Sequence, residues 1–582
     1  MRNAKIVCTL GPASDSKEQI RALAEAGMSV ARLNASHGSP EDRKDVIDRI
    51  RAVDEEVDRS LAVMHDIPGP EVRTANIDEP IYLEGDSRVR FFEGDTATPE
   101  EVGLSVDISV VEPGDCVLLD DGRIETTVEE VDGSDVYVHV ENGGELKARK
   151  GVNVPGVDLD LPFPTEKDRR ELEVAAEKNV DLVAASFVRD GGDIIKINNT
   201  LEEFGADVPV IAKIERKGAV ENLDDIIEET YGVMVARGDL GVELPLEKVP
   251  IFQKQIIRKC NEAGIPVITA TEMLDSMEES RRPTRAESSD VANAVFDGTD
   301  AVMLSGETAI GNHPARVVDT MDDIVQATEQ SDVYERFREQ RVPPSDETQA
   351  DALAHAARTL ADDLDAAAIV AASESGYTAL KTAKFRPSVP IVATTPNDRV
   401  RRQLALSWGI HSVTTPYTTE GADAIIHESV QAALRTNVAE SGDTVVVVSG
   451  MMTDLEGVNT SNMLKIHIAA ETLVSGEAIV SGLATGPLVR VTDGDMGTVP
   501  DRAILAIPEG YDGDIEGDIS GLGGIVDARE TRISPITSVA RDHGVPMIID
   551  APVPAGVDDG TTVTIDAERG VLYEDVVSDY SA

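Results

Sequence analysis

Short apolar runs alternate with amphipathic segments through the first 335 residues of the chain. Val208 to Ile214 and Tyr231 to Ala236 are rich in Val, Ile and Ala, as buried parallel strands are, and a helical segment, Asn222 to Glu229, separates them. This strand and helix pair recurs about eight times, the number that closes a parallel barrel. The pattern therefore predicts an α/β fold built on a (β/α)8 TIM barrel.

The rhythm changes from about Thr74 to Val154, where short alternating strands turn at Gly-containing pairs, which predicts an inserted small β-barrel lid. A polar stretch near 335 to 350 with a Pro pair predicts a linker, and βα patterns resume after it. We expect four domains: a barrel (1–70 and 157–335), a β lid (71–156), a second α/β domain (345–474) and a separable α/β unit (475–582).

Charged side chains follow the strands of the predicted barrel. The strand that ends at Ile214 carries Lys213 and Glu215 on one face, and the next strand leads into Gly238 and Asp239. Carboxyl ends of neighbouring barrel strands meet at one face, so Glu215 and Asp239 are expected to share a hard cation beside Lys213. The alternative is that these charges only cap solvent-facing strand ends. Polar residues at further strand ends argue against it: Arg32, Asn34, Ser36, His37, Asp66, Ser186, Thr271 and Ser305.

Two other loops have an anion-binding pattern. Arg149 and Lys150 lie near the return from the lid, where they could meet an anionic substrate or be ordinary surface charges. In the second α/β domain a strand leads into SESGYTA, where Ser373, Ser375 and Thr378 precede or open a helix. Free N–H groups there suit a phosphate, although Ser and Gly are also plain helix caps.

Acidic residues outnumber basic ones by 108 to 53, which gives a formal net charge of −55 over 582 residues. This charge argues against a nucleic-acid partner and favours a protein of concentrated salt, where charges are screened. Cys8, Cys116 and Cys260 are far apart in the sequence and are expected to be buried, reduced thiols. No apolar run approaches a membrane helix, and we expect a cytoplasmic protein with no membrane partner.

Eight motifs give the chain a resemblance to the pyruvate kinase family over about residues 4 to 475. They are KIVCTLGPAS, VARLNASHG, GPEVRT, KGVNVPG, AKIER, VMVARGDLGVELP, RRPTRAESSDVANAV and MLSGETA, in family-like order. The resemblance implies phosphoryl transfer from phosphoenolpyruvate to ADP, giving ATP and pyruvate. It also implies a homotetramer, and a phosphorylated effector is an open expectation.

The resemblance also assigns roles to single residues. It implies Mg²⁺ (or Mn²⁺) at Glu215 and Asp239, and K⁺ at Asn34, Ser36, Asp66 and the carbonyl of Ile67. Lys213 and Arg32 would hold the phosphoryl group. It implies that the substrate carboxylate is bound by Gly238, Asp239 and Thr271. It implies that the nucleotide is bound by Asn34, His37, Arg73 and Lys150. Thr271 and Ser305 with water would protonate enolpyruvate.

The sequence departs from the family pattern at several places. Ile67 and Pro68 replace the usual threonine and lysine, and the loop Gly450 to Asn462 lacks the basic and aromatic residues of sugar-bisphosphate pockets. The last unit resembles a phosphohistidine swivelling domain, but Pro535 stands in place of its histidine, so an interface or stability role is expected there. Two other functions stay open: an inactive metabolite sensor, and a magnesium-dependent barrel lyase.

Overall fold

The computed structural model describes residues 2–345, 348–416, 422–450, 461–470, 472–492, 494, 497, 499–513, 515, 517–530 and 532–577. It forms two compact units. The first comprises Met1–Ser345, Ala383–Arg386 and Asn397–Ser412, and the second comprises Asp346–Thr382, Pro387–Pro396 and Val413–Ala582. Within the described residues, no helix is both long and apolar enough to span a membrane.

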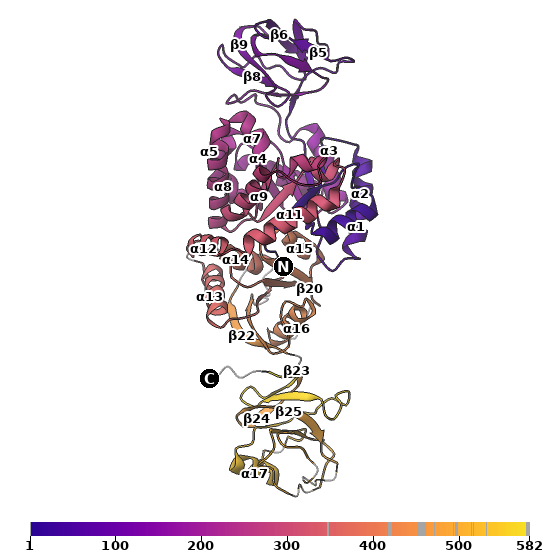
Figure 1. Cartoon of the computed structure of the whole chain (residues 1–582), viewed down its shortest axis with the longest axis vertical. Coiled ribbons are helices and arrows are strands. Elements are labelled where there is room, and N and C mark those ends of the chain that lie inside the picture. Colours follow the sequence, from indigo (N-terminus) through magenta and orange to yellow (C-terminus); the bar gives the residue numbers. More distant parts are fainter. Residues whose placement is uncertain are drawn as a thin grey trace. The chain divides into compact units, whose positions relative to one another are not determined.

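Eight parallel strands close the barrel of the first unit in the order β1-β17-β16-β15-β14-β13-β3-β2. This closure confirms the predicted α/β barrel fold. Helices surround the barrel (Figure 1). The strands are β1 (Lys5–Thr9), β2 (Val30–Asn34), β3 (Ala62–Ile67), β13 (Leu182–Ala185), β14 (Val210–Ile214), β15 (Gly232–Ala236), β16 (Val267–Ala270) and β17 (Ala301–Leu304).

Several helices of this unit begin or end at residues with strong capping chemistry. Ser39 and Thr284 each form a reciprocal capping box, and Gly27 and Gly264 end helices with positive φ. The helices are α1 (Lys17–Ala26), α2 (Pro40–Asp54), α3 (Glu166–Glu177), α4 (Gly191–Glu203), α5 (Lys217–Glu221), α6 (Leu223–Glu229), α7 (Arg237–Glu243), α8 (Val249–Ala263), α9 (Arg285–Asp297), α10 (Gly306–Ala309), α11 (Pro314–Glu329), α12 (Asp332–Gln340) and α15 (Asp398–Gln403).

Alternation along the strands separates two apolar layers. Val7 and Met64 face the barrel interior, while their neighbours Cys8 and Val63 pack against the surrounding helices. The interior is thus a filled core and not a channel. Leu406, from the segment 397–412, joins the interior cluster and is fully buried.

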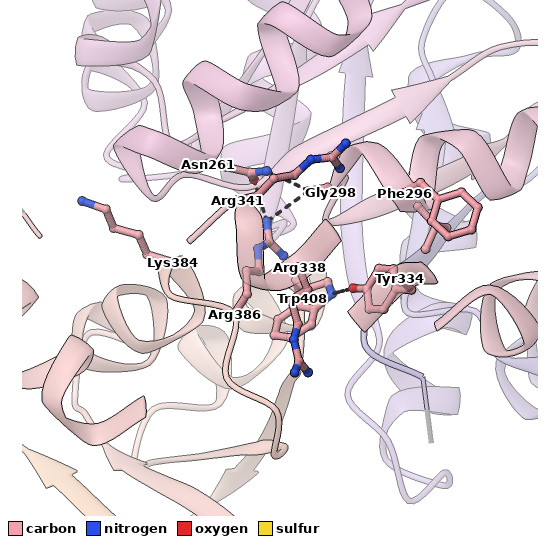
Figure 2. Close-up of a pocket in the computed structure, with 10 residues that line it drawn as sticks. Asn261, Phe296, Gly298, Tyr334, Arg338, Arg341, Lys384, Arg386 and Trp408 are labelled. Carbon is pink, nitrogen blue, oxygen red and sulfur yellow. Dashed lines mark hydrogen bonds between the residues drawn. The ribbon is translucent and has the colours of Figure 1, made fainter. Parts of the chain in front are cut away.

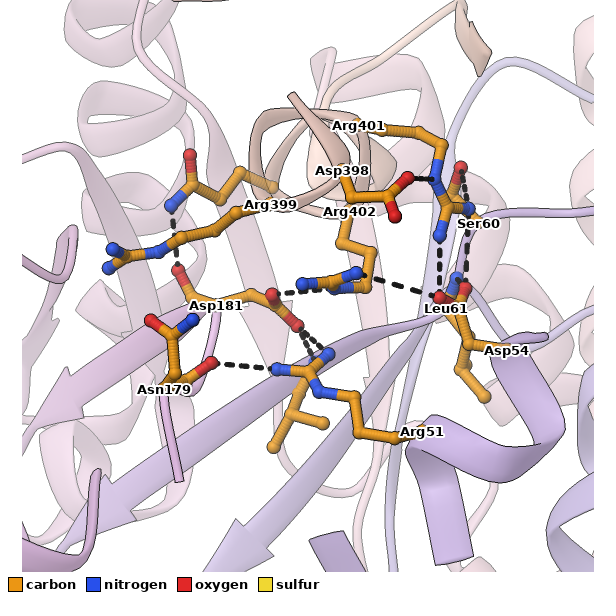
Figure 3. A network of polar contacts seen from close by, with 12 residues as sticks. Arg51, Asp54, Ser60, Leu61, Asn179, Asp181, Asp398, Arg399, Arg401 and Arg402 are labelled. Atoms are coloured by element: carbon orange, nitrogen blue, oxygen red, sulfur yellow. Dashed lines mark hydrogen bonds and ion pairs between the residues drawn. The ribbon is translucent and has the colours of Figure 1, made fainter. Parts of the chain in front are cut away.

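Buried ion pairs also hold this late segment on the barrel (Figure 3). Arg401 contacts Asp54 at 2.5 Å, and Arg402 contacts Asp181 at 2.9 Å. Asp181 is fully buried and also accepts the backbone N–H of Val63 at 2.7 Å. Asp54 likewise accepts the N–H of Leu61, just before β3, at 2.8 Å. Because each carboxylate is paired with both an arginine and a backbone amide, the contacts meet the condition for tolerable buried charge.

The inserted lid contains β strands and a small apolar core around Val89, Phe91 and Val138. Its larger sheet has the order β4-β12-β8-β9-β10-β6-β7, and β11 pairs with β5. The strands are β4 (Val72–Arg73), β5 (Ile81–Leu83), β6 (Arg88–Glu93), β7 (Glu101–Leu104), β8 (Cys116–Leu119), β9 (Ile124–Asp132), β10 (Asp135–Asn142), β11 (Gly144–Leu146) and β12 (Gly151–Asn153).

The second unit contains two sheets. Strands β19, β18, β21 and β22 are neighbours in the first, and the second has the order β23-β30-β29-β25-β26-β27-β28-β24. The elements from residue 349 on, other than α15, are α13 (Gln349–Asp363), β18 (Ala368–Ala372), α14 (Tyr377–Lys384), β19 (Ile391–Thr395), β20 (Ile410–Thr414), α16 (Ala422–Arg435), β21 (Asp443–Ser449), β22 (Met463–Ala469), β23 (Thr472–Ser475), β24 (Glu477–Val480), β25 (Leu483–Arg490), β26 (Ile504–Ile507), β27 (Gly524–Asp527), α17 (Pro535–His543), β28 (Met547–Ile549), β29 (Thr562–Asp566) and β30 (Val571–Glu574).

Two expectations need correction. The linker predicted near 335 to 350 begins later, because α12 continues to Gln340, capped by Ser331 and anchored by the buried Tyr334. All three cysteines are free, but only Cys8 and Cys260 are buried; Cys116 is half-buried in the lid.

Candidate active site

The carboxyl ends of the strands on one side of the barrel carry a row of buried, charged side chains. Arg32 on β2 donates from Nε to Asp66 on β3 at 2.7 Å, and its Nη2 lies 2.6 Å from the same oxygen. Lys213 on β14 lies 3.5 Å from the other oxygen of Asp66. All three are at least nine-tenths buried. The structure thus brings together three residues that the sequence placed on separate strands.

Two hydroxyl groups extend this row into a belt across neighbouring strands. Ser186, which follows β13, accepts a hydrogen bond from Lys213 at 2.7 Å and donates to Asp66 at 3.2 Å. Thr9 on β1 accepts from Arg32 at 2.9 Å and donates to the carbonyl of Leu304 on β17 at 3.0 Å. The belt therefore connects β14, β13, β3, β2, β1 and β17 in barrel order.

Glu215 lies beside this belt and completes a cluster with Lys213 and Asp239. The ammonium of Lys213 lies 2.8 Å from Glu215 Oε1, and Oε2 accepts the N–H of Phe187 at 2.6 Å. Phe187 has a positive φ of 58°, an unusual conformation for a bulky residue. This strained turn aims a backbone donor at Glu215.

The charges in the cluster shift the pKa values of its members in opposite directions. Burial acts against ionisation of Asp66, but Lys213 and Arg32 outweigh it and hold the pKa of Asp66 below its usual range. Burial also opposes the charge of Lys213, yet Asp66 and Glu215 raise its pKa above the usual value. Burial and the neighbouring Glu215 carboxylate raise the pKa of Asp239 to about 7.

The donor set of Glu215 and Asp239 fits a divalent cation. Two adjacent carboxylates resist joint ionisation, which adds to the effect of burial on the pKa of Asp239, and a hard cation removes that repulsion. The described part of the chain holds no group of three or more His, Cys, Asp or Glu that could enclose a metal ion. A cation here would take its other oxygen ligands from substrate and water, as Mg²⁺ commonly does.

A strained turn after β16 forms another part of the barrel mouth. Thr271 has a φ of 68°, although it is β-branched, and its Oγ1 accepts the N–H of Gly238 at 2.8 Å. Arg237 holds the turn by donating to the carbonyl oxygens of Ala270 at 3.0 Å and Thr271 at 2.6 Å. Such conformations persist only where surrounding contacts determine them, and they concentrate at functional sites.

Ser305 follows β17 and is held by its own loop. Its N–H donates to Oε2 of the buried Glu307 at 2.6 Å, and Oε1 of Glu307 accepts the N–H of Leu274 at 3.0 Å. Burial raises the pKa of Glu307, although the backbone donors oppose this. Glu307 therefore ties the Ser305 loop to the loop that carries Thr271.

The loop after β2 carries the residues expected to bind K⁺ and nucleotide. Asn34 Oδ1 accepts the N–H of Ser36 at 3.0 Å, and Arg43 donates to the carbonyl of His37 at 2.6 Å. Arg43 also donates through Nε to Glu171 at 3.0 Å. Asn34 pairs in register with Asp66, so this loop lies next to the end of β3, where Ile67 is fully buried.

The side chains of Glu171 and His65 hold Arg43 in place. Oε2 of Glu171 lies 3.0 Å from Nε2 of His65, which directly precedes Asp66 and is fully buried. Burial opposes ionisation of Glu171, but His65 and Arg43 outweigh it and lower its pKa. Arg43 and Glu171 thus fix the loop that carries Asn34.

The predicted lid residues lie together at the stem of the lid. Arg73 donates to Glu71 at 2.6 Å, and Lys150 lies 2.7 Å from Asp120. The N–H of Thr74 donates to the carbonyl of Lys150 at 2.9 Å, which joins the two stem segments. Among the contacts between described residues, no hydrogen bond or ion pair connects Arg73 or Lys150 to Asn34 or His37.

The expected effector residues lie at the start of α14. Ser373 Oγ accepts the N–H of Thr378 at 3.3 Å, and the hydroxyl of Thr378 lies 2.8 Å from that of Ser461. Ser375 is exposed beside Gly376, which has a φ of 81°. Residues 451–460 of the second expected loop lie outside the described residues.

Sequence reasoning missed several residues that hold the site. The sequence assigns no role there to Thr9, Arg43, Glu171 and Arg237. Thr9, Arg43 and Arg237 each contact an expected site residue or its backbone, and Glu171 holds Arg43. The signal available was position: Thr9 ends β1 as Asn34 ends β2. Except for Arg43 and His37, the paired residues lie 23 to 128 positions apart in the chain, so a single sequence does not reveal these pairs.

The fold and site define a class of protein. A closed parallel barrel gathers cations beside a carboxylate pair suited to a divalent ion, and this arrangement belongs to barrel enzymes that bind and transfer small anionic groups.

Comparison with known proteins narrows the class. A model of the pyruvate kinase barrel domain matches residues 1–318, and a model of the pyruvate kinase alpha/beta domain matches residues 351–467. The chain is 40% identical over 586 residues to pyruvate kinases of Staphylococcus aureus strains MRSA252 and USA300, covering 99% of this chain and 99% of each relative. The chain belongs to the pyruvate kinase family. Since the alignments span both chains almost entirely, the relatives also possess a C-terminal extension.

Proposed function

We propose that the barrel site transfers the phosphoryl group of phosphoenolpyruvate to ADP, which yields pyruvate and ATP at the end of glycolysis. The observation that carries the proposal is the buried cluster in which Lys213 lies 2.8 Å from Glu215 and 3.5 Å from Asp66, with Arg32 on the other side of Asp66. Membership of the pyruvate kinase family supports the same reaction.

In this proposal Lys213 and Arg32 bind the phosphoryl group in flight. Its transition state is loose and spreads negative charge over the equatorial oxygens, so positioned cations contribute more than a strong base. Asp66, Ser186 and Thr9 hold both cations in place before substrate arrives. Little reorganisation is then needed when charge develops.

Pyruvate kinases generally use Mg²⁺ and K⁺, and we assign the divalent ion (Mg²⁺ or Mn²⁺) to Glu215 and Asp239. When bound it supplies positive charge shared by enzyme and phosphorylated substrate. We assign K⁺ to oxygens of Asn34, Ser36, Asp66 and the carbonyl of Ile67. The adjacency of Asn34 and Asp66 in strand register supports this assignment.

The turn at Thr271 would bind the substrate carboxylate. The N–H of Gly238 donates to Thr271 Oγ1 at 2.8 Å, and we propose that a carboxylate oxygen takes over this donor with help from the adjacent backbone of Asp239. Thr271 and Ser305, acting with water, would then deliver the proton to the enolpyruvate carbon. Glu307, which contacts both loops, would keep the two hydroxyl groups in range.

Nucleotide binding is assigned to Asn34 and His37 on the barrel, and to Arg73 and Lys150 at the lid stem. Arg73 and Lys150 are now paired with Glu71 and Asp120, so binding of phosphate groups would exchange these partners.

The remaining assignments concern organisation. We propose a barrel (1–70, 157–335), a lid (71–156), an effector domain (345–474) with Ser373, Ser375 and Thr378 at a phosphate subsite, and an extension (475–582) that carries no phosphate because Pro535 replaces histidine. The assembly would be a homotetramer working in concentrated salt, in keeping with a formal charge of −55.

The proposal is tested by following pyruvate formation from phosphoenolpyruvate with and without ADP. Product that depends on ADP, Mg²⁺ and K⁺ is the expected result. ADP-independent release of pyruvate from a carbon–carbon bond would identify a lyase, and binding without turnover would identify a sensor. Titrations of KCl, and assays with sugar phosphates and AMP, test the K⁺ site and the effector subsite separately.

A further inference from the structure

A small cationic pocket lies within the first unit, apart from the barrel mouth (Figure 2). In the described part of the chain, its lining consists of Asn261, Val295, Phe296, Gly298, Tyr334, Arg338, Arg341, Lys384, Arg386 and Trp408. Four of these residues are basic and none is acidic. The chain as a whole has 108 acidic and 53 basic residues, so a lining with basic but no acidic residues differs strongly from the average composition of the chain.

Arg386 occupies the middle of the lining. It is 8% exposed and uses one nitrogen, Nη2, for all of its described hydrogen bonds, to Asn261 Oδ1 at 2.6 Å and Gly298 O at 3.2 Å among them. Its Nε and Nη1 are buried and make no hydrogen bond to the described residues, although the guanidinium lies over the Trp408 ring, with Cζ 4.9 Å from the ring centroid. Buried N–H groups of a guanidinium need an acceptor, and an anion satisfies them better than a neutral group.

Arg338 contributes a second unsatisfied donor. Its Nε is buried and has no partner among the described residues, although Nη2 lies 3.3 Å from Glu339. Figure 2 shows Arg386 with Asn261 and Gly298 on one side and Trp408 on the other. It also shows the charged ends of Arg338, Arg341 and Lys384 directed away from that of Arg386, so these three raise the local potential without contacting the same point.

The nearby carboxylates do not cancel this charge. Asp300 lies 3.1 Å from Arg386 but also accepts the N–H groups of Trp408 and Val267, at 3.1 and 3.0 Å. Asp297 lies 2.5 Å from Lys254 and only 3.9 Å from Arg341. The positive charge of the lining therefore exceeds what the adjacent carboxylates can balance.

The size of the cavity selects among anions. Its volume is about 20 Å³, and one water requires about 10–15 Å³ by the same measure. A nucleotide or sugar phosphate is far too large, whereas a monatomic anion close to water in size fits. The apolar side, formed by Val295, Phe296 and Trp408, suits a weakly hydrated monovalent ion.

We propose that this pocket binds a single halide ion, chloride in the cell, at the buried N–H groups of Arg386, with Arg338 adding positive charge to the lining. The bound ion would neutralise the contact between the late segments carrying Arg386 and Trp408 and the barrel helices α9 and α12. Chloride would therefore stabilise the docking of these segments on the barrel, independently of the chemistry at the barrel mouth.

Bromide replaces chloride in crystals of the full chain and reports its position by anomalous scattering. The expected result is a bromide peak inside the pocket, within hydrogen-bonding distance of Arg386. Water alone at this position, or a peak only on the surface, would overturn the proposal without relying on any variant.

A solution experiment uses thermal unfolding while potassium chloride is exchanged for potassium gluconate, so that K⁺ and ionic strength stay fixed. Chloride is expected to raise the Tm of the wild-type chain by at least about 2 °C. R338Q should lose this difference, whereas R336Q should keep it, because Arg336 is exposed on the same helix and does not line the pocket. Equal chloride effects in both variants would show general ion effects only and refute the site.

Discussion

Replacing Lys213 by Met removes the cation that the proposed chemistry needs most. Met keeps most of the length of the side chain, but the ammonium that donates to Ser186 at 2.7 Å and pairs with Glu215 at 2.8 Å is lost. Asp66 keeps Arg32 as its partner, whereas Glu215 keeps the N–H of Phe187 and the neighbouring Asp239 carboxyl but loses its cation. The variant therefore leaves one strongly buried carboxylate without a cation.

Two separate energies follow from this change. Loss of one preorganised electrostatic contact to a transition state costs about 2.7–4 kcal/mol, which is about 10²–10³ in kcat. Removing one partner of a buried ion pair costs about 3–5 kcal/mol of folding stability when nothing replaces it. A divalent ion at Glu215 offsets part of the second cost by mass action, but it cannot supply the first.

The assay is the steady-state rate of ADP-dependent pyruvate formation at saturating substrates, Mg²⁺ and K⁺. Lys213→Met is expected to reduce kcat at least about 10²-fold, while thermal unfolding in the presence of Mg²⁺ verifies that the variant is folded. Lys217→Met is the matched control, because Lys217 is exposed and pairs only with Glu221 at 3.6 Å in the described structure. A folded Lys213→Met enzyme with turnover near that of wild type would refute the role of this ammonium.

Three further changes test other parts of the structure. Gly69→Ala places a Cβ 2.6 Å from a backbone oxygen at a φ of 71°, so we expect a lower Tm and reduced activity, whereas Gly218→Ala, with open space around it, should change neither. In Arg43→Lys a single ammonium cannot bind both oxygens of Glu171 and also reach the carbonyl of His37. The K⁺ concentration for half-maximal activity should therefore rise several-fold, while kcat at saturating K⁺ changes little. Burial lowers the pKa of Lys5 to about 7. Above that pH the unfolded chain retains a proton that the folded chain has lost, so stability should rise from pH 7 toward pH 10 by up to about 1.4 kcal/mol per pH unit, and Lys5→Met should abolish this rise in thermal unfolding.

The barrel and the centre of the site could be predicted from the sequence because strand geometry leaves little freedom. Residues two apart in a strand share a face, so Lys213 and Glu215 had to point the same way, and their ammonium and carboxylate lie 2.8 Å apart. Parallel strands in a closed barrel bring their carboxyl ends together, so Asp66 had to approach the same point. Pattern and topology were sufficient for these pairs.

Other contacts depended on register and on distant segments. The pairing of Arg32 with Asp66 depends on the register of β2 and β3, in which Asn34 lies opposite Asp66. The periodicity of the sequence does not specify this register. The apolar pair Ala405 and Leu406 could have packed in any core, yet it joins the barrel interior. Single-sequence reasoning identifies which residues seek burial, but not which of several cores receives them.

Strand β3 connects the segment that contains α15 to the site at the other end of the barrel. Buried carboxylates bind backbone amides at the start of β3: the N–H of Leu61, just before the strand, donates to Asp54 at 2.8 Å, and the N–H of Val63 donates to Asp181 at 2.7 Å. The same two carboxylates hold the arginines of α15 (Figure 3). Near its other end the strand carries Asp66, which orients both cations of the proposed phosphoryl site. A strand is nearly inextensible, so β3 is fixed at both ends by buried charge, and a change in how α15 is held must be accommodated along the strand that positions Asp66.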